Sequence, residues 1–91
     1  MSVTVRIPTQ LRPLTGGSAE VHAPAGEVRA VIEHLDGVYP GLRERLLDSE
    51  GGLRRFVNVY VGEEDVRFLD GLGTPVADGT PVSIIPAVAG G

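Results

Sequence analysis

The chain has 91 residues, of which 42% are hydrophobic and 22% charged, and its formal net charge is −4 at pH 7. This length suits one domain with a modest core, and the acidic balance argues against nucleic acid or an anionic membrane as the main partner. Since there is no cysteine, disulfides, thiolate metal sites and thiol nucleophiles are excluded. All eight basic residues are arginine, which excludes lysine-based phosphate loops and Schiff bases.

The first residues favour a cytoplasmic protein. Residues 1–6 contain no apolar signal-peptide core and no cleavage site, and no apolar run of the sequence is long enough to cross a bilayer. We therefore expect the chain in the cytoplasm.

Two strands are predicted before residue 25. Apolar and polar residues alternate over residues 3–7, which is typical of a strand with one buried face, and Pro8 ends the pattern. Gly16-Gly17 marks a turn, after which alternation resumes over residues 18–23. We expect two strands joined by a hairpin or a short loop.

A helix is predicted from Glu27 to about Pro40. Its apolar residues recur at helical spacing and form one stripe that faces a sheet, namely Val28, Val31, Ile32, Leu35 and Val38. One or two further helical turns are expected over residues 42–47, and residues 48–52 are typical of a surface loop.

The second half predicts two or three more strands. Residues 56–61 are predicted to form a strand with apolar residues on both faces, which is expected near the centre of a sheet or beneath the helix. An acidic turn over residues 62–65 precedes a short strand over residues 66–68, and residues 69–77 are expected to be loop. Asp78-Gly79 then turns the chain into a final strand over residues 82–85.

The C-terminal residues are the strongest functional candidate. Pro86 is followed by five uncharged residues that end in a free carboxylate, Ala87, Val88, Ala89, Gly90 and Gly91. Because glycine has no Cβ, a partner's walls could close directly around the backbone, and five extended residues reach about 17 to 18 Å. A Gly-Gly end arises by chance in roughly one chain in fifty at this glycine content, but this tail has none of the charge or serine of a solubilising linker.

Other candidate sites are weaker. His22 and His34 lack a local set of metal ligands, so we interpret them as surface histidines and expect no metal. The acids at Glu63, Glu64 and Asp65 are typical of a solvated turn, and Gly71-Leu72-Gly73 lacks the spacing of a phosphate loop. Four arginines lie near the loop before residue 56, where solubility explains most of them and docking of a partner is the alternative: Arg43, Arg45, Arg54 and Arg55.

Together these elements predict an α+β protein in which a mixed sheet of four to five strands packs under one main helix, in the order ββαββ(β). That order is the order of the β-grasp, or ubiquitin-like, fold, in which the first and last strands lie parallel at the middle of the sheet. We expect a β-grasp domain over residues 1–86 and a flexible tail over residues 87–91.

Residues 78–91 resemble the end of the ThiS/MoaD family of sulfur carriers: an acidic-Gly turn, an apolar strand, a proline and a short tail to Gly-Gly. Residues 55–61, 65–68 and 3–8 are similar to the members of that family that serve cysteine biosynthesis. The resemblance covers nearly the whole chain and implies a carrier protein, a co-substrate of partner enzymes and not itself an enzyme.

The resemblance also implies a reaction cycle at Gly91. A ubiquitin-activating-like adenylyltransferase uses ATP to make an acyl-adenylate, and a sulfur donor displaces AMP to leave a thiocarboxylate. The sulfur then attacks the aminoacrylate that a pyridoxal-phosphate-dependent cysteine synthase makes from O-phosphoserine, and a zinc-dependent peptidase releases the cysteine. The tail, residues 87–90, enters the partner active sites, and the carrier itself binds no cofactor.

Several alternatives stay open at this point. The sulfur acceptor could belong to thiamin, molybdopterin or secondary-metabolite synthesis, and the domain could instead be a β-grasp adaptor or a protein modifier. A monomer is the default oligomeric state.

Overall fold

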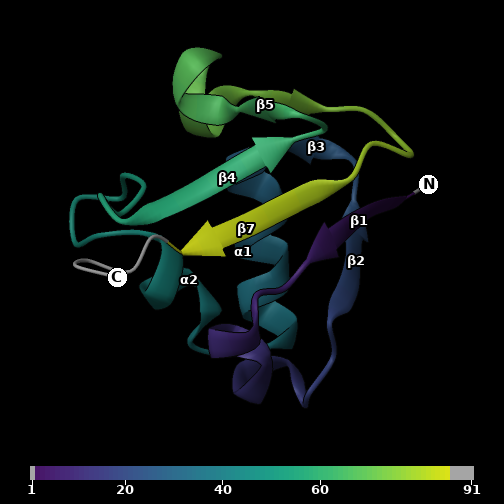
Figure 1. Ribbon diagram of the computed structural model, residues 1–91, viewed down its shortest axis with the longest axis vertical. Helices are drawn as coiled ribbons and strands as arrows, with labels where there is room; N and C mark the ends of the chain where they lie inside the picture. Colours follow the sequence, from purple (N-terminus) through teal and green to yellow (C-terminus); the bar gives the residue numbers. More distant parts are fainter. Residues whose placement is uncertain (1, 87–91) are drawn as a thin grey trace.

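The computed structural model describes residues 2–86, so the five tail residues lie outside the part described here. A five-stranded mixed sheet runs in the order β2-β1-β7-β4-β5, with helix α1 behind it in the view of Figure 1. Its strands are β1 (Ser2–Arg6), β2 (Glu20–Pro24), β4 (Val57–Val61), β5 (Glu64–Asp65) and β7 (Val82–Pro86). The helices are α1 (Val28–Val38) and α2 (Leu42–Leu46).

Smaller elements connect these parts. A second sheet pairs β3 (Gly26–Glu27) with β6 (Pro75–Val76). Three 3-10 turns complete the chain: η1 (Thr9–Thr15), η2 (Val66–Phe68) and η3 (Gly71–Gly73). No helix within residues 2–86 is long and apolar enough to cross a bilayer.

The last strand lies at the centre of the sheet. β7 pairs in parallel with β1, with Val5 opposite Val82 and Arg6 opposite Ser83, and antiparallel with β4 over its whole length. β1 in turn pairs antiparallel with β2. The expected parallel pairing of the first and last strands is therefore confirmed, and so is the β-grasp arrangement of a mixed sheet against one main helix.

The core lies between the sheet and α1. Val3 and Val5 of β1 are fully buried, while their neighbours Ser2 and Arg6 are exposed, as the alternation predicted. The helix buries Leu35 and three of the other stripe residues. Val38, the fifth, is 55% exposed and is the last residue of the helix.

The end of α1 is held by a side chain that the sequence pattern did not single out. Asp36 Oδ1 accepts the backbone N–H groups of Gly41 and Arg43, both at 3.1 Å. Gly41 has a φ of 99°, which favours glycine. The chain therefore turns directly from α1 into α2, and α2 is the further helical turn expected over residues 42–47.

Three sequence-based expectations were wrong in detail. Residues 66–68 form the 3-10 turn η2 and not a strand, because Asp65 Oδ1 accepts the backbone N–H of Arg67 at 2.9 Å and caps the turn. Residues 69–77 are not only loop, since they contain η3 and β6. The strand expected from Phe56 begins one residue later, and Phe56 is 51% exposed.

The link between the first two strands also holds more structure than a simple hairpin. η1 occupies residues 9–15 and buries Leu11 before the turn at Gly16 and Gly17, whose φ angles are 66° and 89°. The sequence pattern placed the glycine turn correctly but did not indicate the 3-10 helix.

A matched pair of truncations in α1 tests this packing. Leu35→Ala is expected to lower the free energy of unfolding by about 2–5 kcal/mol, because it removes a fully buried side chain. Val38→Ala, in the same helix but half-exposed, should change it by no more than about 0.5 kcal/mol. Urea unfolding followed by circular dichroism measures both, and equal losses of stability would contradict the assigned burial.

Candidate functional site at the root of the tail

The described part of the candidate site is the strand that carries the tail. The predicted site residues Ala87, Val88, Ala89, Gly90 and Gly91 all lie outside the described residues, so their positions stay predictions. β7 leads to them with Val82 and Ile84 buried, and with Ile85 48% exposed on the opposite face. β7 pairs with β1 at Val82 and Ser83 and with β4 as far as Pro86, so the root of the tail is held by β4 at the end of a central strand.

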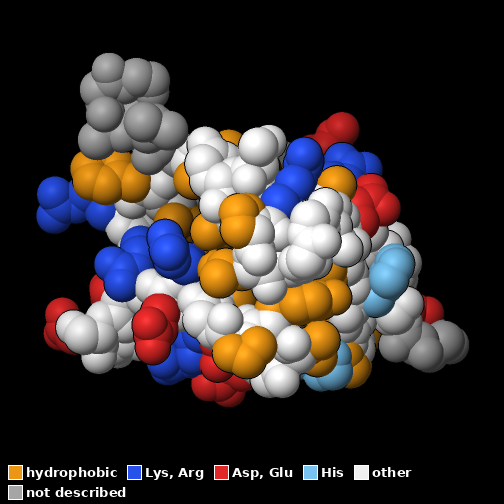
Figure 2. Space-filling view, turned by 90° about the horizontal axis from the view of Figure 1, so that it is seen from below, with side chains coloured by type: hydrophobic (Ala, Val, Ile, Leu, Met, Phe, Trp, Pro, Cys, Tyr) orange, Lys and Arg blue, Asp and Glu red, His pale blue; other side chains and the backbone are white. Residues whose placement is uncertain are grey.

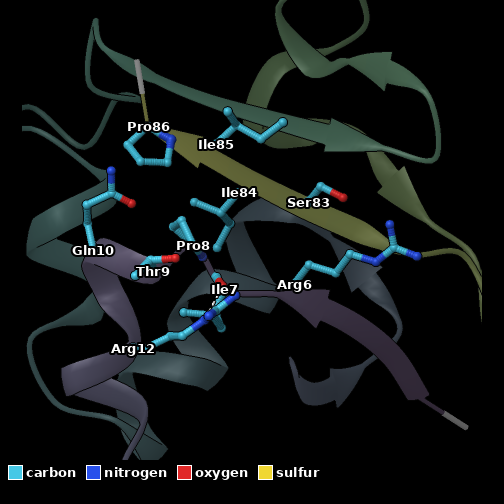
Figure 3. Close-up of a pocket in the computed structure, with 10 residues that line it drawn as sticks. All are labelled: Arg6, Ile7, Pro8, Thr9, Gln10, Arg12, Ser83, Ile84, Ile85 and Pro86. Carbon is cyan, nitrogen blue, oxygen red and sulfur yellow. Dashed lines mark hydrogen bonds between the residues drawn. The ribbon is translucent and has the colours of Figure 1, made fainter. Parts of the chain in front are cut away.

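Two hollows flank this root. The first lies where β1 and β7 separate: their pairing stops at Arg6 and Ser83, and Pro8, which has no N–H to donate, turns the chain into η1. The resulting groove has a volume of about 470 Å³ and lies beside the end of β7 (Figure 3). Its lining residues are Arg6, Ile7, Pro8, Thr9, Gln10, Arg12, Ser83, Ile84, Ile85 and Pro86.

η1 forms one wall of this groove, and a hydrogen bond links η1 to the residue after β1. Arg12 Nε donates a hydrogen bond of 3.2 Å to the carbonyl oxygen of Ile7, drawn as a dashed line in Figure 3. Thr9 and Gln10 are exposed and face the end of β7 in the same view. The groove is therefore a mixed surface, with apolar side chains from β7 and polar ones from η1.

The second hollow lies on the other side of the root. β4 starts opposite the end of β7, with Val57 paired to Pro86. A depression of about 550 Å³ opens at the start of β4. Its lining is rich in arginine and apolar side chains: Asp48, Leu53, Arg54, Arg55, Phe56, Val57 and Arg67. In the space-filling view, basic and hydrophobic side chains lie next to one another at the left-hand end of the molecule, where Figure 1 shows α2 and the loop before β4.

Arg67 is a residue of this hollow that the sequence pattern missed. Its Nη1 donates to Asn58 Oδ1 at 2.7 Å and its Nη2 to the carbonyl oxygen of Arg54 at 2.6 Å. The contact joins η2 to a loop twelve or more residues earlier, so no local pattern indicates it. The nearest signal in the sequence is Asp65 two residues before it, which caps η2 and so orients Arg67.

The four arginines that were considered together do not form one group. Arg54 and Arg55 line the hollow, whereas Arg43 Nε lies 3.6 Å from Glu33 Oε1 and Arg45 is an exposed residue of α2 that lines none of the hollows described. Solubility and pairing therefore account for Arg43 and Arg45, and the alternative of partner docking concentrates on Arg54 and Arg55.

The remaining candidates are dispersed. His22 is exposed on β2, with Nδ1 3.5 Å from Thr4 Oγ1, and His34 is exposed on α1. Glu63 and Glu64 are exposed, and Gly71–Gly73 forms η3. Within residues 2–86, no three histidine or acidic side chains gather in a way that could hold a metal ion.

Comparison with known proteins places this geometry in a family. Residues 5–91 match the ThiS family. The sulfur carrier protein CysO of Mycobacterium tuberculosis is 57% identical over 93 aligned positions that cover all of both chains. A putative sulfur carrier protein of Archaeoglobus fulgidus is 34% identical over the full length of both.

Solved structures agree with the fold. CysO of Amycolatopsis orientalis, crystallised as a BexX/CysO complex, superposes with a TM-score of 0.92 at 48% identity, over 98% of this chain and 99% of the other. Crystalline CysO of M. tuberculosis gives a TM-score of 0.90 at 56% identity, over 94% and 99%. Matches of this extent across sequence and structure confirm the expected resemblance, and we conclude that the chain belongs to the ThiS family and is a sulfur carrier protein.

Proposed function

We propose that the α-carboxylate of Gly91 is the group that carries the sulfur, as a thiocarboxylate. The observation that supports this most is the full-length similarity to CysO, which reaches the C-terminal residue of both chains. The anchored position of β7 adds a physical reason: a rigid strand in the centre of the sheet presents whatever follows Pro86 to a partner at a defined place.

The chemistry requires activation, because a carboxylate is a poor electrophile. A carboxylate oxygen of Gly91 attacks the α-phosphorus of ATP and releases pyrophosphate, which leaves an acyl-adenylate. A sulfur donor then attacks the carbonyl carbon and displaces AMP. The chain has neither cysteine nor lysine, so no thiol or ε-amino group of its own competes for the activated acyl group.

Partner enzymes supply the catalytic groups in this proposal. The activating enzyme is an adenylyltransferase that uses ATP, and the sulfur passes to a pyridoxal-phosphate-dependent cysteine synthase and then, as bound cysteine, to a zinc-dependent peptidase. CysO of A. orientalis is known in complex with BexX, which supports a carrier that acts while held by other proteins. Binding of the folded body keeps the reacting end at high effective concentration in each active site, and the need for ATP favours the cytoplasm.

Cysteine made from O-phosphoserine is the acceptor we favour, on the strength of the CysO relatives. Carriers of thiamin, molybdopterin or secondary-metabolite synthesis are the alternatives within the same chemistry. A second function has its own support: the small archaeal modifier protein 3 of Haloferax volcanii is 41% identical over 67% of this chain and 65% of its own length. Conjugation to lysines of target proteins is therefore the second candidate.

Incubation with ATP, a sulfide source and the cognate adenylyltransferase tests the proposal. The intact mass should rise by the difference between one sulfur and one oxygen atom, because AMP is the leaving group. A sample without ATP should keep its mass. If the modifier function dominates, amide-linked adducts of much higher mass appear with target proteins present; an unchanged mass with an enzyme shown to be competent on another carrier contradicts the proposal.

Deletion of Gly91 should abolish the conversion while leaving the fold intact, because residues 2–86 contain the whole core described above. A short C-terminal extension after Gly91 should have the same effect, since it removes the free carboxylate. The same extension placed before Met1 is the control and should leave conversion unchanged. Full activity of the Gly91 deletion, measured by the same mass shift, would show that the reacting group lies elsewhere.

A further inference from the structure

The hollow at the start of β4 has a fixed position relative to Pro86, the last described residue. Val57, which lines it, pairs with Pro86, and Gly91 is five residues further along the chain. Five extended residues reach at most about 17 to 18 Å. Any enzyme that acts on Gly91 must therefore come within that distance of Pro86, and the surface over Arg54, Arg55 and Phe56 adjoins Val57, the pairing partner of Pro86.

This surface carries positive charge that the described part of the chain does not neutralise. The two ion pairs found within residues 2–86 are Arg6 with Glu20 and Arg43 with Glu33, so neither involves an arginine of the hollow. Asp48, the acid in its lining, turns Oδ1 to the backbone N–H groups of Glu50 and Gly52, both at 2.9 Å. The hollow is thus basic on a chain whose net charge is −4.

The backbone that carries these arginines is held in place. Arg67 binds the carbonyl oxygen of Arg54 from one side, and Arg54 Nε donates to the carbonyl oxygen of Glu44 at 2.8 Å on the other. Among the described residues, the two terminal nitrogens of Arg54 and the whole guanidinium of Arg55 have no hydrogen-bond acceptor. Within residues 2–86 these donors are therefore unengaged and sit on a backbone that is held in place. The planar fork of a guanidinium matches a carboxylate in two parallel hydrogen bonds.

The character of the occupant follows from the neighbouring apolar side chains. Phe56 is 51% exposed and Leu53 lies in the same lining. A small anion would use the arginines but not the phenyl ring, whereas arginine beside an exposed aromatic residue is the composition found at the energetic centres of protein interfaces. We infer that Arg54, Arg55 and Phe56 form a docking surface for an acidic segment of the adenylyltransferase that activates Gly91, an inference that rests on the function proposed above.

A pair of charge reversals tests this docking surface. Arg55→Glu should raise the KM for the carrier in adenylate formation by about tenfold or more, with little change in kcat, because it places like charges face to face. ATP–pyrophosphate exchange measures both constants. Arg45→Glu is the matched control: it makes the same change in net charge at an exposed position of α2 that lines none of these hollows, and its KM should stay within about twofold of wild type.

Two further measurements separate the explanations. Added salt should raise the wild-type KM more than that of Arg55→Glu, since screening weakens an attraction that the variant lacks. Arg55→Lys keeps the charge but not the planar guanidinium, so its KM for the carrier should lie between that of wild type and that of Arg55→Glu. Unfolding in urea checks that Arg55→Glu is folded. If it is not folded, Arg55→Ala is used instead, and its KM for the carrier is expected to rise by a smaller factor.

The outcomes that overturn the inference are distinct. If wild type forms no adenylate with a competent enzyme, the proposed function fails and this inference fails with it. If wild type is active and Arg55→Glu behaves like Arg45→Glu, only the docking surface is wrong. A change in the KM for ATP would assign the arginines to the nucleotide, and a wild-type dimer that Arg55→Glu dissociates in sedimentation equilibrium would assign them to a second copy of the chain.

Discussion

The parallel pairing of β1 with β7 is the constraint on which the rest of this structure depends. It joins the two ends of the described chain, Val5 to Val82 and Arg6 to Ser83, at the centre of the sheet. β2 and β4 then add on the outer sides, and α1 covers the face on which Val3, Val5, Val82 and Ile84 are buried. A parallel pair needs a long crossover, and almost the entire domain is that crossover. The tail therefore follows an interior strand of the sheet and not an edge strand.

This placement connects packing with function. In the function proposed above, the carrier presents its C-terminal end to the active sites of partner enzymes while those enzymes bind its folded body. The pairing of β7 with β1 at Val82 and Ser83, and with β4 as far as Pro86, fixes where the described chain ends, and the two hollows lie on either side of that point. The hollows differ in chemistry: the one against η1 mixes polar and apolar groups, and the one in front of β4 is basic.

Much of the fold follows from local patterns. Alternation located β1 and β2, helical spacing located α1, and the order of elements was sufficient to indicate the β-grasp. Some failures have a visible physical cause. At residues 66–68 the side chain of Asp65 accepts a backbone N–H and caps a 3-10 turn, and Val38, the last residue of α1, is exposed. Arg67 joins η2 to the loop before β4, a long-range contact that periodicity cannot reveal. The predicted working residue, Gly91, was indicated by composition, position and resemblance, and residues 2–86 show only how its strand is held.

The central claim is that sulfur is carried at the chain end and nowhere else. Because the sequence has no lysine and its last arginine is Arg67, trypsin releases the C-terminal residues 68–91 as one peptide. Fragmentation of that peptide, after activation with ATP and sulfide, measures where the added sulfur resides. If Gly91 carries the sulfur, every fragment containing Gly91 has the full mass difference and fragments lacking it have none. Sulfur found on a fragment without Gly91, or spread over several positions, would contradict this claim.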